Sequence, residues 1–162
     1  MFRKTNLLIF GCFLLAAASL SATAPTFLMN SADAAVTRAV QSSVQSSGSG
    51  TDTCPDGSTV SGISTRFAAA ATDGSASGYF QLFAPSGAQV QATVNTAQIS
   101  HNNFKISGIV TTDTICPSSV LSTAFSANGP CGSGVTVQYA TANGERATIP
   151  DVTFASCMFV RS

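Results

Sequence analysis

The chain has 162 residues, with seven basic residues, seven acidic residues, one histidine and no tryptophan. Only 9% of the residues are charged, against about a quarter in a typical soluble domain. This length fits one domain of common size, and a net charge of zero argues against nucleic-acid binding, which needs a basic surface. Apolar residues recur in strand-like patterns, which excludes a wholly disordered chain.

The N-terminus has the form of a secretory signal peptide. Arg3 and Lys4 precede a strongly apolar run and then small residues, as in exported proteins. We expect a signal peptide over residues 1–34 that is cleaved after Ala34, with Ala24 as the alternative site. An uncleaved membrane anchor is the competing interpretation, but the apolar run is shorter than the roughly 20 residues of a membrane-spanning helix. Contact with a membrane is expected only through such an uncleaved leader.

The composition changes twice after the leader. Residues 35–53 are rich in Ser and Gly and are typical of a flexible linker. Residues 54–162 alternate apolar and polar positions, with turn residues about every ten positions, and we expect them to form the β-domain.

The alternating runs predict the strands of this domain. They cover residues 63–69, 80–84, 90–94, 104–110, 121–125, 135–139 and 152–157, and 146–149 form an eighth if Pro150 separates them from the last. Alternation with one polar face is typical of antiparallel sheets, and no helical stripe follows residue 54. We therefore predict an all-β fold, an antiparallel β-sandwich or barrel of seven to eight strands with two disulfides.

The disulfides involve the four cysteines that remain after export. An even number of cysteines in an oxidising compartment indicates paired thiols. These structural cysteines are Cys54, Cys116, Cys131 and Cys157. The chain contains no Cys-x-x-Cys motif, so neither a thioredoxin-like redox site nor a zinc site is expected. The predicted location is secreted, extracellular or at the cell surface.

A hairpin favours one of the three cysteine pairings. Asn143 and Gly144 tolerate the positive φ angles of a type I′ turn. With these two residues as the loop, the ladder continues until Cys131 lies opposite Ser156, next to Cys157. The register thus favours Cys131–Cys157, because paired Cα atoms lie within about 7 Å. Cys54–Cys116 follows by elimination, provided that no bulge at Pro150 shifts the register.

The residues that suggest catalysis also have simpler interpretations. His101 is the only histidine and lies in a polar turn, where we expect an exposed residue without a catalytic partner. The segment Gly74–Gly78 resembles a nucleophile elbow but places Ala76 at the position of the nucleophile, so a flexible turn is expected there.

The acidic residues of the mature chain show no metal-binding spacing. They are Asp52, Asp56, Asp73, Asp113, Glu145 and Asp151. Two of them could form a glycosidase pair, but the chain offers few aromatic platforms for a sugar. Asp52 and Asp56 could contribute to a calcium site, although Asp56-Gly57 and Asp73-Gly74 are typical of β-turns. We expect no catalytic, cofactor-binding or metal site, and no cofactor.

The C-terminal part resembles a known kind of domain. Residues 129–137, Ala142–Arg146 and Cys157 are similar to the C-terminal end of small secreted, disulfide-containing prokaryotic β-domains of unknown function. The resemblance covers about 30 residues. It implies a bridged, exported β-domain and carries over no activity or site residue.

Three functions remain, in decreasing order of support. The first is a non-catalytic β-domain with a structural, adhesive or surface-assembly role, which self-associates or binds a surface partner through a sheet edge. The only lysine after the leader is Lys105, although lysines commonly protect such edges. The second is an extracellular small-molecule or glycan-binding module. Its cavity would be lined by Phe67, Phe80, Phe83, Phe104 and Phe125. A secreted hydrolase is the third.

Overall fold

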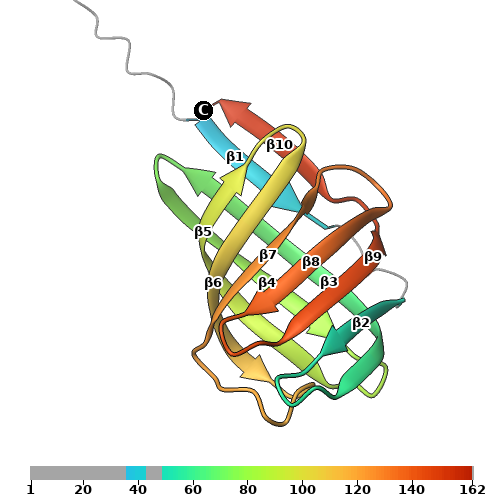
Figure 1. The fold of residues 1–162 in the computed structure, drawn as a ribbon. Coiled ribbons are helices and arrows are strands. Elements are labelled where there is room, and N and C mark those ends of the chain that lie inside the picture. The colour runs from blue at the N-terminus through green and yellow to red at the C-terminus, as the bar shows by residue number, and fades with distance from the viewer. Residues whose placement is uncertain (1–35, 43–48, 162) are drawn as a thin grey trace, which may run out of the picture. The chain divides into compact units, whose positions relative to one another are not determined.

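The computed structural model describes residues 36–42 and 49–161, which form ten strands and no helix. The predicted signal peptide, residues 1–34, lies outside the described residues. No helix in this part of the chain is long and apolar enough to cross a membrane. In chain order the strands are β1 (Val36–Gln41), β2 (Gly50–Thr53), β3 (Thr59–Thr72), β4 (Ser75–Phe83), β5 (Gln89–Ile99), β6 (Asn103–Asp113), β7 (Ala124–Pro130), β8 (Val135–Thr141), β9 (Arg146–Val152) and β10 (Ser156–Arg161) (Figure 1).

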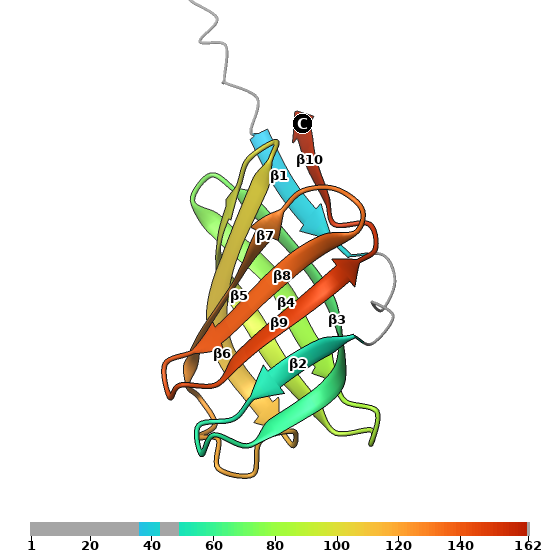
Figure 2. The same cartoon turned by 45° about the vertical axis from the view of Figure 1, so that its right-hand side comes forward.

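Eight of these strands close into an antiparallel barrel. Around the barrel the order is β3-β2-β9-β8-β7-β6-β5-β4, and β4 pairs with β3 again. Strand β1 pairs with the second half of β3, and β10 pairs with β1, so these two strands extend the wall at one end (Figure 2). The predicted all-β architecture is confirmed, and of the two alternatives the chain adopts the barrel.

Aromatic rings fill the centre of the barrel. Period-two alternation turns one side chain in two inward, and the largest of these meet at mid-height. The Phe80 ring lies 5.2 Å from that of Tyr139, 5.7 Å from Phe125 and 5.8 Å from Phe67. Phe104 lies 5.0 Å from Phe67. Phe80 and Phe67 are fully buried. Phe83 lies three positions after Phe80 and therefore faces the other side of β4, where it is half-buried.

The predicted linker is wrong where the chain is described. Residues 35–53 include strands β1 and β2, while residues 43–48 lie outside the described residues. Val40 and Ser42 are 1% and 2% exposed, and the backbone N–H of Phe67 donates to Ser42 Oγ at 2.9 Å. Ladder bonds to β3 on one side and β10 on the other hold β1. Composition reports only local preference, and this tertiary pairing overrides it.

Two predicted strand boundaries are also wrong. The run 121–125 becomes a strand only from Ala124, because Ser122 has a φ of 63° and breaks the extended chain. The run 152–157 is interrupted in the same way by Phe154, with a φ of 58°. Val152 therefore ends β9 and a short turn leads to β10, which makes residues 146–152 a separate strand.

The hairpin turns follow the chemistry of their residues. Asp73 and Gly74 form the two-residue loop between β3 and β4. Their φ angles of 47° and 83° are both positive, as a type I′ turn requires. The loop at Asn143-Gly144 has three residues instead of the predicted two. Thr141 N–H donates to Glu145 O at 3.0 Å, and only the glycine of that loop has positive φ.

The three-residue loop shifts the first part of the β8–β9 ladder by one residue from the predicted register, and a bulge then restores the predicted register. The register changes between Val135 and Val137, opposite Pro150 and Asp151, where Asp151 has a φ of 53°. Beyond the bulge, Gly132 pairs with Ala155, in the register first expected for the hairpin. The predicted cysteine positions therefore come out correctly because two deviations cancel.

Both disulfides have the predicted pairing. Cys131 and Cys157 have Cα atoms 5.7 Å apart and join the β7–β8 loop to β10. Cys54 and Cys116, 5.4 Å apart, join the chain after β2 to the loop after β6. The loops that they close span 26 and 62 residues. Loop entropy alone predicts a stabilisation of about 3.5 and 4 kcal/mol, respectively.

The filled interior makes a first prediction. Phe80→Ala should lower the free energy of unfolding by about 3–5 kcal/mol, because it leaves a cavity among rings that cannot all collapse into it. Phe83→Ala removes the same atoms from the outer face and should cost less than half as much. Urea denaturation of both variants measures the difference. Equal losses would contradict the placement of these two rings.

Candidate functional site

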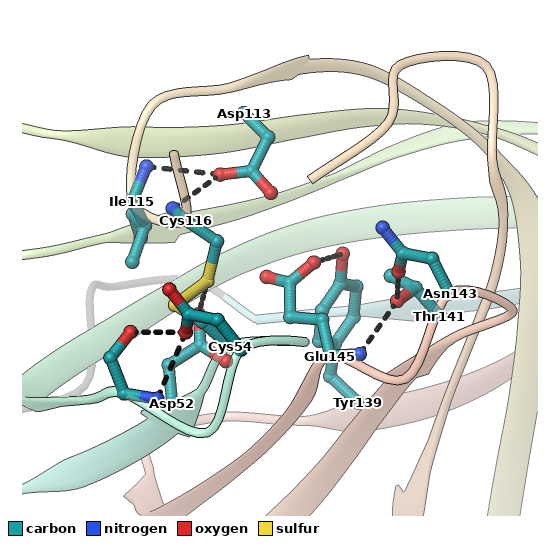
Figure 3. The surroundings of a disulfide bond; sticks show 11 residues. Asp52, Cys54, Asp113, Ile115, Cys116, Tyr139, Thr141, Asn143 and Glu145 are labelled. Carbon is teal, nitrogen blue, oxygen red and sulfur yellow. Dashed lines mark hydrogen bonds between the residues drawn. A yellow bond between two sulfur atoms is a disulfide. The ribbon is translucent and has the colours of Figure 1, made fainter. Parts of the chain in front are cut away.

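Three carboxyl groups gather inside one end of the barrel, beside the Cys54–Cys116 disulfide (Figure 3). They belong to Asp52 on β2, Asp113 at the end of β6 and Glu145 in the turn before β9. Asp52 and Glu145 are 0% and 1% exposed, which is unusual for acidic side chains. We refer to these three residues as the acidic cluster.

The strands turn each of these side chains inward. Ala147 on β9 points into the barrel, and Asp52 on β2 is its cross-strand partner, so Asp52 points inward as well. Glu145 lies two positions before Ala147 and therefore faces the same side. Asp113 is placed differently. The β5–β6 register shifts between Gln91 and Ala92, and this bulge moves Asp113 from the outer set to the inner one.

Hydrogen bonds satisfy only part of the cluster. Asp113 Oδ1 accepts the N–H groups of Ile115 and Cys116 at 2.9 and 3.0 Å. The Tyr139 hydroxyl donates to Glu145 Oε2 at 3.4 Å. The Cys116 sulfur lies 3.9 Å from Asp52 Oδ2, but a disulfide sulfur carries no hydrogen to donate. One buried oxygen of each carboxyl group therefore lacks a donor while all three groups are ionised.

Protonation of Glu145 resolves this conflict. Burial raises the pKa of Glu145 to about 9, with further contributions from the charges of Asp52 and Asp113 and from its hydrogen bonds to both. Burial also raises the pKa of Asp52, to about 6, partly opposed by its hydrogen bond with Glu145. At neutral pH Glu145 thus keeps its proton and donates it within the cluster, as expected for carboxyl groups that share one site. Burial likewise raises the pKa of Tyr139.

The acidic cluster suits neither catalysis nor a metal. Asp52 and Glu145 are closed off from solvent, so a substrate from outside has no access to them. The potential ligand atoms within 4.8 Å of one another are those of Asp52, Glu145 and Cys116. Cys116 is disulfide-bonded and offers no thiolate, and two carboxylates fall far short of the six to eight oxygens that Ca²⁺ takes. The arrangement stores a proton.

Comparisons with protein-family models, with curated proteins and with solved structures found no match to this chain. The site must be interpreted from its own geometry.

The residues singled out as catalytic or metal-binding candidates are dispersed. His101 lies in an exposed turn, with its ring centroid 4.1 Å from that of Phe159, and forms no hydrogen bond or ion pair with a described residue. Asp56 is in the predicted turn, where bonds from the Ser58 hydroxyl and N–H lower its pKa. It is exposed, whereas Asp52 points inward, so the two do not share a cation site. Residues 75–78 belong to β4 and do not form an elbow.

The predicted ligand cavity does not form as expected. Four of the five phenylalanines proposed to line it are among the rings that fill the barrel, and the fifth, Phe83, faces outward. The simpler interpretation of these residues as an ordinary core is therefore supported.

Few features of the sequence pointed to the acidic cluster. Asp52 was assigned to a linker, and a bulge that alternation does not reveal turns Asp113 inward. Only Glu145 carried a signal, because it has the parity of Ala147 and Ile149, both fully buried.

The cluster predicts an unusual pH dependence. The pKa of Glu145 is 4.5 in the unfolded chain and about 9 in the folded protein, so folding takes up a proton between these values. Stability should therefore fall as the pH rises through this window, by about 1.4 kcal/mol per unit where a full proton is taken up. The raised pKa of Asp52 adds to the slope up to about pH 6. Thermal unfolding should show a melting temperature at least about ten degrees lower at pH 9 than at pH 5.

Substitution distinguishes the contribution of Glu145 to this pH dependence from the contributions of other titrating groups. Glu145→Gln keeps a donor in the cluster and should remove most of the loss between pH 6 and 9. Asp56→Asn alters an exposed carboxyl group whose pKa is lowered and should leave the slope in this range unchanged. A wild-type protein equally stable at pH 5 and 9, or a Glu145→Gln variant with an unchanged slope, would refute this role of Glu145.

Proposed function

We propose that the chain is an exported, non-catalytic β-domain that assembles with further copies of itself through the free edge of β10. The observation that carries the proposal is the topology of the sheet. Eight strands close on themselves, so each pairs with a strand on both sides over at least part of its length, whereas β10 is the end of the sheet and pairs only with β1. Closure removes most edges from a barrel, and within the described residues β10 is the strand whose outer edge is free along its whole length.

The composition of β10 supports association along this edge. Its sequence, Ser156–Arg161, contains neither Lys nor Pro, the residues that commonly block edge pairing. Met158 is 46% exposed at the middle of the strand. Backbone hydrogen bonds supply the affinity when a strand is added to such an edge. A second copy of the chain is the partner that we favour, because the mature chain is nearly neutral and repels itself only weakly.

The predicted leader and the disulfides support the proposal of export. The first described strand begins at Val36, directly after the predicted cleavage point at Ala34. Cleavage there would release the folded unit without a tether, whereas cleavage after Ala24 would leave a short extension. Two disulfides are compatible with an oxidising location outside the cell, and the C-terminal resemblance to secreted β-domains supports the same assignment.

The assembly proposal is tested by light scattering of the purified mature protein over a range of concentrations. The mean mass should rise with concentration, and Met158→Lys should abolish the rise by placing a charge on the edge strand. Leu121→Lys is the matched control, since it replaces a residue that is 54% exposed in the β6–β7 loop, and it should associate like the wild type. A strictly monomeric wild type, or equal loss in both variants, would exclude this assembly.

The export proposal is tested by the intact mass of the protein recovered outside the cell. The mass should equal that of residues 35–162 less two pairs of hydrogens, one pair for each disulfide. A mass that includes the leader, or native protein that reacts with thiol reagents, would contradict it. A chain that begins at residue 25 would keep the export proposal and move the cleavage site.

A further inference from the structure

The end of the barrel opposite the acidic cluster is hollow. At this end the β3–β4 and β5–β6 turns lie beside β1 and β10 (Figures 1 and 2). A cavity of about 480 Å³ opens here between Arg38, Ala71, Ala76, Ala97 and Ile99. A second cavity of about 440 Å³ lies next to it, and Arg38, Ala97 and Ile99 line both. We call the two together the mouth.

The mouth is hollow because its inward side chains are small. At mid-height the inward positions of β3 and β4 are Phe67 and Phe80, which fill the barrel. Four residues nearer the end, the same faces carry Ala71 and Ala76 instead. The β4–β5 ladder also ends at Gly78 and Val94, so the two hairpins separate beyond the core. The space that they leave is lined by apolar and polar side chains.

Arg38 places a positive charge at this space. It has the parity of the buried Val40 on β1 and pairs directly with Phe159 on β10, with its guanidinium carbon 5.8 Å from the ring centroid. Within the described residues Arg38 forms no ion pair. Lys105 lines the second cavity, and among the described residues Asp73 is the only acidic one that lines either cavity.

We propose that the mouth binds a small organic monocarboxylate. The planar guanidinium of Arg38 presents paired N–H donors that match the two oxygens of a carboxylate. Ala71, Ala76 and Ala97 would receive a short aliphatic or aromatic group, beside the polar side chains that line the rest of the mouth. A single arginine suits one carboxylate better than a multiply charged phosphate, which needs more donors. Among the described residues none of β10 lines the mouth, so the inference does not depend on self-association.

The experiment uses benzoate and hexanoate as probes for the mature protein in 0.15 M salt. Calorimetry and NMR amide shifts should detect binding, with shifts concentrated in β1 and at the β5–β6 turn. Benzyl alcohol, which has no charge, should bind at least tenfold more weakly, since a charge-assisted pair contributes at least about that factor. Equal binding of benzyl alcohol, or no binding of either acid at millimolar concentration, would overturn the proposal.

Two variants decide whether Arg38 is responsible. Arg38→Met keeps an apolar stem, removes the charge and should weaken benzoate binding at least tenfold. Arg66→Met is the matched control, because Arg66 is also exposed and lies 5.9 Å above an aromatic ring, that of Tyr79, but lines neither cavity of the mouth. It should bind benzoate within about twofold of the wild type. Equal weakening in both variants would reveal nonspecific charge attraction and refute the site.

A third variant tests the cavity itself. Ala97→Leu fills space that both cavities share without a change in charge, and it should weaken hexanoate binding while the fold, measured by circular dichroism, stays intact. Undiminished binding of hexanoate by this variant would contradict an apolar group held in the mouth.

Discussion

The double pairing of β3 is the constraint on which the rest of the structure depends. This strand of 14 residues pairs with β4 along one edge and, on the other, first with β2 and then with β1. Through β2 it meets β9 and closes the barrel, and through β1 it carries β10 beyond the closure. One long strand therefore both closes the barrel and, through β1, carries the strand whose outer edge is free along its whole length in the described sheet.

Closure also explains why the two ends of the barrel differ. The inward positions continue past the aromatic core at both ends, and residue size and charge decide what happens there. At one end they are acidic, and a shared proton together with a nearby disulfide offsets the cost of burying three carboxyl groups. At the other they are alanines, and the end stays open around an arginine. In this account the acidic end determines how stability varies with pH, and the open end is the proposed ligand site.

The sequence predicted those parts of the fold that depend on local pattern. Alternation located the strands around Phe67, Phe80 and Val137, and Asp73-Gly74 forms the turn expected of its residues. It could not reveal β1 and β2, whose order comes from pairing with residues far along the chain. Bulges were equally hidden, because one extra residue reverses the faces of everything that follows. The acidic cluster depends on both effects, which is why only the parity of Glu145 pointed to it.

Hydrogen exchange followed by NMR tests the closed barrel with one free edge most directly. Amides of residues 68–72 in β3 should be protected, since β1 and β4 occupy both edges of this part of the strand. Along β10 of the Met158→Lys variant, which should not associate, fast and slow amides should alternate, because every second N–H points away from β1 and finds no backbone partner in the described sheet. Uniform protection of β10, or rapid exchange in the second half of β3, would contradict this account of the fold.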